Sequence, residues 1–322
     1  MKIYLLHLLT RSRRLFWALA KVMLPVMLAV RAAELAGLID LLGAALGPFM
    51  ALLDLPPQAG LVWVACVFVG IYGGIGALVG LAPQMDLNVA QLSALAAMML
   101  FAHSIPVEQA IVRRAGASFW FTSALRLGLA LLYGAMVAWT CRLLGVLDEP
   151  VSLGWLQGSQ WAAEQAPNVH LAWAQSTLFS LLATYGVILG LLVLLDVLER
   201  LGITRRITVA LTPLLRLSGL DARVAPVTTV GVLLGLTYGG ALIIEEAQKQ
   251  NFPPRTRLLA LSWLSLSHSL IEDTLLMLAL GADIWVVLVG RVALTMLVVA
   301  LMARCLRGGA PEPLRAPARA GG

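Results

Sequence analysis

The sequence predicts an all-α polytopic membrane protein built from two inverted-topology repeats of about five membrane segments each. The first observation is composition: the 322 residues are 60% hydrophobic and only 12% charged, whereas soluble domains carry about 25% charged residues. The second is that hydrophobic residues form ten long runs, and the third is that distinctive residues recur 165 positions apart. The net charge of +6 is confined to short connections, which excludes a nucleic-acid binder, and the composition also excludes a secreted enzyme.

The ten runs are predicted to be helices, because a helix satisfies its own backbone hydrogen bonds in hydrocarbon. They are residues 15–37, 38–55, 60–82, 88–108, 117–143, 175–198, 207–224, 226–247, 258–280 and 284–303. Eight are long enough to cross a bilayer of ~30 Å hydrocarbon thickness. The runs 38–55 and 207–224 are short and contain Pro48 and Pro213, so they either cross or lie in the interface.

The distribution of Lys and Arg favours ten crossings. With the N-terminus inside, sixteen loop Lys and Arg residues fall inside and only Arg142 and Arg223 fall outside. If the two short runs stay at the surface, the balance becomes twelve inside and seven outside, which the positive-inside rule disfavours. We therefore expect a bacterial inner-membrane protein with both termini in the cytoplasm.

The domain organisation follows from this topology. We expect a first repeat at residues 1–145, an extracytoplasmic linker at 146–172, a second repeat at 173–307, and a disordered cytoplasmic tail at 308–322. The two repeats align without a gap. The matched residues include Pro48 with Pro213, His103 with His268, Ser104 with Ser269, Trp120 with Trp285 and Arg126 with Arg291. Five crossings per repeat is an odd number, so the second repeat is expected to be inverted, as in many secondary transporters.

Two motifs carry a resemblance to a known family. The runs His103-Ser104-Ile105-Pro106 and His268-Ser269-Leu270-Ile271-Glu272-Asp273-Thr274, each preceded by a glycine-rich segment, resemble the nucleoside recognition (Gate) family. That family includes spore maturation proteins A and B, and related Gate domains occur in ferrous iron transporters and concentrative nucleoside transporters. The resemblance covers about residues 15–143 and 175–306, and it implies a membrane permease domain with two related gates.

The two histidines are the main candidates for a binding site. An imidazole deep in an apolar segment is costly unless it meets a partner or a polar cavity. The candidate substrate-binding residues are His103, Ser104, Glu108, His268, Ser269, Glu272, Asp273 and Tyr238. On a continuous helix His268 and Glu272 would share one face and bind a cation, a proton or a substrate hydroxyl. The alternative is that the histidines only form structural hydrogen bonds.

Three further features concern helix geometry and buried charge. Pro106 predicts a helix break beside the first motif. Arg126 and Arg291 lie deep within their runs, so each is expected to form a structural ion pair with Glu108, Glu272 or Asp273, or to bind an acidic substrate. The glycine cluster around Tyr238 has an alternative explanation, which is close packing of helices without a ligand.

The predicted function is a permease that moves a small polar solute, nucleoside-like or a small acid, by alternating access between the repeats. The histidines and carboxylates would couple transport to a cation or a proton, and no other cofactor is expected. One alternative is a divalent metal ion transporter, which requires His103, His268, Glu272 and Asp273 to converge. Another is a non-transporting membrane scaffold or assembly factor. The sequence lacks the H-E-x-x-H and G-x-S-x-G motifs of two hydrolase classes, so no enzymatic activity is expected.

The expected partners are the lipid bilayer and a small-molecule or ion substrate, without nucleic acid. The sequence leaves the oligomeric state open, with a homo-oligomer among the options.

Overall fold

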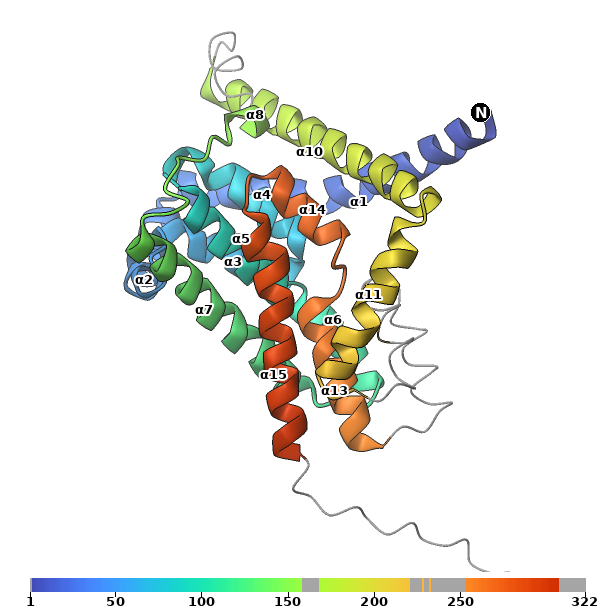
Figure 1. Ribbon diagram of the computed structural model, residues 1–322. Coiled ribbons are helices and arrows are strands. Elements are labelled where there is room, and N and C mark those ends of the chain that lie inside the picture. The colour runs from blue at the N-terminus through green and yellow to red at the C-terminus, as the bar shows by residue number, and fades with distance from the viewer. Residues whose placement is uncertain (1, 158–167, 221–227, 229–231, 233–252, 307–322) are drawn as a thin grey trace, which may run out of the picture.

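The computed structural model describes residues 2–157, 168–220, 228, 232 and 253–306 (Figure 1). Within these residues the chain is helical, and the only strand-like feature is an isolated bridge between Asn88 and Pro150. The first-half helices are α1 (Lys2–Leu35), α2 (Leu38–Leu52), α3 (Pro57–Val69), α4 (Ile71–Leu81), η1 (Ala82–Gln84), α5 (Val89–Phe101), α6 (Ile105–Arg114), α7 (Phe119–Leu144) and α8 (Gly154–Gln157). The remainder are α10 (Val169–Arg200), α11 (Ile203–Leu217), α13 (Pro254–Ser267), α14 (Glu272–Ala279), the π-helix η2 (Trp285–Gly290) and α15 (Arg291–Cys305).

The prediction of an all-α polytopic membrane protein is confirmed. Five stretches among the described residues are helical, long and apolar enough to cross a membrane: Ser12–Leu35, Val89–Arg114, Phe119–Leu144, Val169–Arg200 and Trp285–Cys305. The pair α2 and α3, bent by 93°, would make a sixth span. Most of the predicted run 226–247 lies outside the described residues, and ten crossings stays a prediction.

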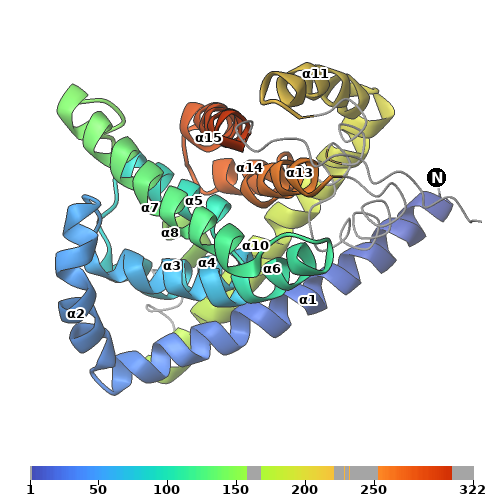
Figure 2. The same cartoon turned by 90° about the horizontal axis from the view of Figure 1, so that it is seen from below.

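The helices of the second half follow those of the first at a spacing of about 165 residues. In this register α10 corresponds to α1, α11 to α2, α13 to α5, and α14 to α6. The packing repeats as well, because α5 lies against α7 in the first half and α13 lies against α15 in the second. Figures 1 and 2 show the long helices α1 and α10 passing one another at one end of the molecule, where they are in contact.

Residues with left-handed backbone conformations also recur at a spacing of 165 positions. Left-handed φ angles occur at Gly37 (68°) and Gly202 (69°), at Ser104 (47°) and Ser269 (48°), at Gly116 (98°) and Gly281 (103°), and at Asp54 (54°) and Gly219 (85°). Non-glycine residues seldom adopt this conformation, so its recurrence at matched serines indicates a shared local fold. The inverted orientation and the domain boundaries stay predictions.

Both His-Ser motifs lie at helix breaks, as predicted near these motifs. The first of these two breaks separates α5 from α6. It lies against a further helix break, outside the motifs, at Gly70 between α3 and α4. The backbone N–H of Ser104 donates to the carbonyl of Cys66 at 3.1 Å, and a Cβ on Gly70 would lie 2.5 Å from Ser104 Oγ. Glycine is therefore required at position 70 for this close approach.

The second break, between α13 and α14, contains no proline. Here the backbone N–H of Leu270 donates to the carbonyl of Val232 at 2.9 Å, so a hydrogen bond from outside the helix replaces one that the break removes. In each break a neighbouring segment thus accepts a hydrogen bond from one backbone N–H, which helps to accommodate irregular backbone inside an apolar core.

Candidate functional site

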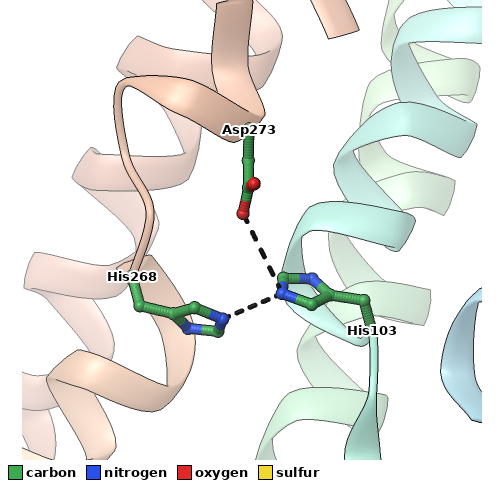
Figure 3. Close-up of side chains that lie close together, drawn as sticks. All are labelled: His103, His268 and Asp273. Carbon is green, nitrogen blue, oxygen red and sulfur yellow. Dashed lines mark hydrogen bonds and ion pairs between the residues drawn. The ribbon is translucent and has the colours of Figure 1, made fainter. Parts of the chain in front are cut away.

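The two motif histidines meet in the core. His103 follows the end of α5, and His268 directly follows α13. Their rings lie 4.7 Å apart between centroids, and the two Nε2 atoms are 2.8 Å apart. Figure 3 shows the rings meeting across the space between the two helix breaks. Because His103 is 5% exposed and His268 1%, the contact is shielded from solvent.

Backbone carbonyls fix the orientation and the tautomer of both rings. His103 Nδ1 lies 3.0 Å from the carbonyl oxygen of Met99, and His268 Nδ1 lies 2.9 Å from that of Leu264. A carbonyl oxygen only accepts hydrogen bonds, so each Nδ1 must carry the hydrogen. In a neutral ring the Nε2 atom then presents a lone pair, and two such lone pairs face one another.

Two carboxylates complete the cluster. Glu108 Oε1 lies 3.2 Å from His103 Nε2 and 3.1 Å from His268 Nε2. Asp273 Oδ2 lies 3.9 Å from His103 Nε2, and Figure 3 shows its side chain directed at that ring. Converging lone pairs of nitrogen and oxygen repel unless a proton or a metal cation lies among them, so this arrangement suits a bound cation.

Arg126 holds Glu108 in place. Its Nη1 lies 2.5 Å from Glu108 Oε2, and it is fully buried. Its Nε donates to the carbonyl of Phe101 at 2.6 Å, and its Nη2 donates to that of His103 at 3.0 Å. Those carbonyls lie beside the break after α5, where the helix no longer supplies N–H partners. The arginine therefore stabilises both the carboxylate and the broken backbone.

Arg291 is bound differently from what the sequence suggests. Its Nε donates to the carbonyl of Leu266, and its Nη2 donates to the carbonyls of His268 and Leu100. Among the described residues its hydrogen-bond partners are these carbonyls, in place of the expected carboxylate, and its buried Nη1 has no hydrogen-bond partner there. Asp273 holds the position that Glu108 has in the first half, but its side chain is one methylene shorter.

The remaining predicted site residues are Ser104, Ser269, Glu272 and Tyr238. Ser104 and Ser269 form the left-handed turns of the breaks. Glu272 borders a narrow hollow beside Tyr72 and α10. The expectation that His268 and Glu272 share a helical face is wrong, because α13 ends at Ser267 and α14 begins at Glu272. Tyr238 lies outside the described residues.

Sequence reasoning missed the backbone atoms that shape the site. The carbonyls of Met99 and Leu264 orient the histidines, and the carbonyl of Leu100 links Arg291 to the first half. The sequence offered no specific signal for these contacts, because every residue that follows a helix has a carbonyl four positions before it.

A larger polar hollow of about 350 Å³ lies away from these residues, where α5 begins and α7 ends. It is lined by Asp54, Asn88, Ala90, Gln91, Ala138, Arg142 and Asp148. None of the predicted site residues lines it.

Two comparisons relate the chain to known proteins. Residues 181–283 match the Gate family, described as nucleoside recognition. The matched range contains the motif at residues 268–273, so the predicted resemblance to Gate proteins is confirmed for this part of the chain. The chain is also 25% identical over 307 residues to the uncharacterized membrane protein YvoD of Bacillus subtilis (strain 168), covering 92% of this chain and 93% of that protein. No solved structure matches the chain.

Proposed function

We propose that this chain is a membrane permease that moves a small polar solute by alternating access of its two related halves, with a cation bound at the histidine pair. The observation that carries the proposal is the buried contact between His103 Nε2 and His268 Nε2. It joins equivalent residues of the two halves at two helix breaks, where backbone dipoles and side chains can bind a ligand inside the membrane.

The contact between equivalent residues supports a mechanism in which the halves move against each other. Two copies related by a twofold axis bring the same residue together only where that axis passes. A rotation of residues 1–145 against 173–307 would then open the site toward one side of the bilayer while keeping its position. We place the chain in a bacterial inner membrane with both termini in the cytoplasm.

Two observations guide the choice of solute. The Gate family model is described as nucleoside recognition, which favours a nucleoside-like solute. The buried guanidinium of Arg291, whose Nη1 has no hydrogen-bond partner among the described residues, favours a small carboxylic acid, since arginine binds carboxylates well. The histidine cluster would supply the coupling site for a proton or a metal ion in either case.

Uptake into proteoliposomes tests this proposal. Purified protein is reconstituted, and uptake of labelled nucleosides and small carboxylates is measured under an imposed proton or cation gradient. The variants are His103→Ala and His268→Ala, with His170→Ala as the matched control because His170 is exposed at the start of α10.

We expect uptake by the wild type and by His170→Ala, and loss of uptake in both motif variants. Unchanged flux in His268→Ala would remove the histidine pair from the transport path. Absence of uptake by the wild type for every nucleoside and acid tested would favour a scaffold instead.

A further inference from the structure

We propose that the cation at the histidine pair is a first-row divalent metal ion of the zinc type. Its ligands are His103 Nε2, His268 Nε2 and a carboxylate oxygen of Asp273, with Glu108 Oε1 as the fourth. This inference rests on the proposed function only for the passage of the ion. Binding of the ion can be tested without any transport assay.

The ligand atoms are close to the spacing that a metal requires. Those of His103, His268 and Asp273 all lie within 4.8 Å of one another. Zinc binds nitrogen and oxygen at ~2.0–2.2 Å, so neighbouring ligands of a tetrahedral ion are ~3.3–3.6 Å apart. The distances of 2.8, 3.1 and 3.2 Å among the Nε2 atoms and Glu108 Oε1 need only small adjustments. Asp273, whose carboxylate oxygen is 3.9 Å from His103 Nε2 and within 4.8 Å of the His268 ligand atom, would move toward the rings by up to about 1 Å to reach this spacing.

The surroundings of the ligands are those of metal-binding residues. A histidine that binds a metal usually donates its other ring N–H to a carbonyl or a carboxylate, which fixes the tautomer. Both histidines do so, toward the carbonyls of Met99 and Leu264. Glu108 is held through Oε2 by Arg126 while Oε1 faces the rings, so its free oxygen is already oriented.

The donor set selects the class of metal. Two imidazole nitrogens with carboxylate oxygens suit zinc, iron, nickel or copper, whereas magnesium and calcium prefer oxygen alone. The buried thiol of Cys66 is directed at the carbonyl of Met99 and is not among the ligands, which disfavours metals that need sulfur.

The local charge fits a metal ion that binds reversibly. Arg126 neutralises Glu108, so the ligand set carries little net negative charge and binds a dication less tightly than an all-carboxylate site would. An ion that is transported must bind strongly enough to enter and weakly enough to leave. The site therefore fits a coupling ion or a cargo better than a permanent structural ion.

Cobalt and zinc binding tests the proposal. Full-length protein in detergent is freed of metal with a chelator, which is then removed, and is titrated with Co²⁺ while its visible absorption is recorded. Zn²⁺ is added afterwards to displace the cobalt. The variants are His103→Gln, His268→Gln and Asp273→Asn, with His170→Gln as the control.

We expect about one Co²⁺ per chain with the intense visible bands of a tetrahedral site, displaced by Zn²⁺. Each histidine variant should bind Co²⁺ at least about tenfold more weakly than the wild type. Loss of an outer partner of a metal ligand already weakens binding about 10–100-fold, and loss of a ligand itself should weaken it no less. The affinity of His170→Gln should equal that of the wild type. X-ray absorption of the zinc-loaded wild type, which needs no variant to fold, should show nitrogen and oxygen neighbours.

Three outcomes would overturn the metal site. They are no Co²⁺ or Zn²⁺ binding by the wild type, Co²⁺ binding by both histidine variants that is as tight as in the wild type, or a sulfur neighbour of zinc in the X-ray absorption spectrum. Solute uptake without metal binding would reject this inference and keep the permease, whereas metal binding without any uptake would keep the site and reject the permease.

Discussion

Arg126 and Arg291 occupy matched positions 165 residues apart, yet of these two arginines only Arg126 forms an ion pair with a described residue, Glu108. Both guanidinium groups donate through Nε and Nη2 to carbonyls at equivalent positions, two residues before the motif histidine and at the histidine itself. The two halves thus share this arrangement and differ at Nη1. In Arg126 this nitrogen pairs with Glu108, whereas in Arg291 it has no hydrogen-bond partner among the described residues.

Loss of the buried ion pair should be costly. Glu108→Gln leaves the charge of Arg126 uncompensated in the core, and we expect the free energy of unfolding to fall by about 3–5 kcal/mol. Adding Arg126→Met to the same chain should recover part of this loss. Denaturant unfolding of the protein in detergent micelles measures both effects.

The matched control for that experiment is Asp54→Asn, which breaks an ion pair with Arg142, whose side chain is 61% exposed. We expect a change below about 1 kcal/mol because solvent screens exposed pairs. Equal losses for Glu108→Gln and Asp54→Asn would contradict the buried, tightly packed site.

The contact between Gly70 and Ser104 should not tolerate a methyl group. Gly70 has a φ of 110°, and an added Cβ would lie 2.5 Å from Ser104 Oγ, so Gly70→Ala should lower the melting temperature and the yield of folded protein. Gly128→Ala is the control, because nothing lies within 4 Å of its added Cβ and alanine favours helix by about 0.5–1 kcal/mol. Similar melting temperatures for the two variants would argue against the paired helix breaks.

The left-handed turn at Ser269 predicts an unusual response to glycine. Ser269→Gly should leave stability unchanged or raise it by up to about 1 kcal/mol, since left-handed backbone costs a non-glycine residue about 1–2 kcal/mol. Ser265→Gly, in the interior of α13, should instead lower it by roughly 0.5 kcal/mol or more. Thermal unfolding compares the pair, and destabilisation of equal size at both positions would mean that α13 and α14 form one unbroken helix.

Tyr133 and Gly290 should be energetically coupled across the two halves. The Tyr133 hydroxyl donates to the carbonyl of Val286 at 2.9 Å, and a Cβ on Gly290 would lie 1.8 Å from that hydroxyl oxygen. Gly290→Ala should therefore be destabilising, and part of that loss should disappear when Tyr133→Phe is present. A double-mutant cycle is expected to show a coupling of about 0.5–3 kcal/mol. Strict additivity would indicate that α7 and the π-helix η2 are not in contact.

The sequence predicted the features that depend on residue identity and spacing. Apolar run length predicted the membrane helices, and Pro106 predicted the first break. The 165-residue register predicted that His103 and His268 are equivalent, and the structure brings these two residues into contact. These properties depend on local chemistry and on duplication, both of which can be read from one chain.

Features set by tertiary contacts were not predictable in the same way. The break after His268 has no proline and depends on a hydrogen bond to the carbonyl of Val232, a partner that is distant in sequence. That break directs Asp273, and not Glu272, to the histidines. The carbonyl partners of Arg291 likewise exist only because two helices end beside it.

The most direct test is a solid-state nuclear magnetic resonance measurement of the distance between the two histidine side chains. The chain has only four histidines, so ¹⁵N-histidine labelling of metal-free protein in lipid gives a simple spectrum. With the Nε2 atoms 2.8 Å apart, we predict a ¹⁵N–¹⁵N correlation between His103 and His268 that is lost in His268→Gln and kept in His170→Gln. Absence of this correlation in the wild type, with each ring resolved separately, would contradict the meeting of the two halves at these histidines.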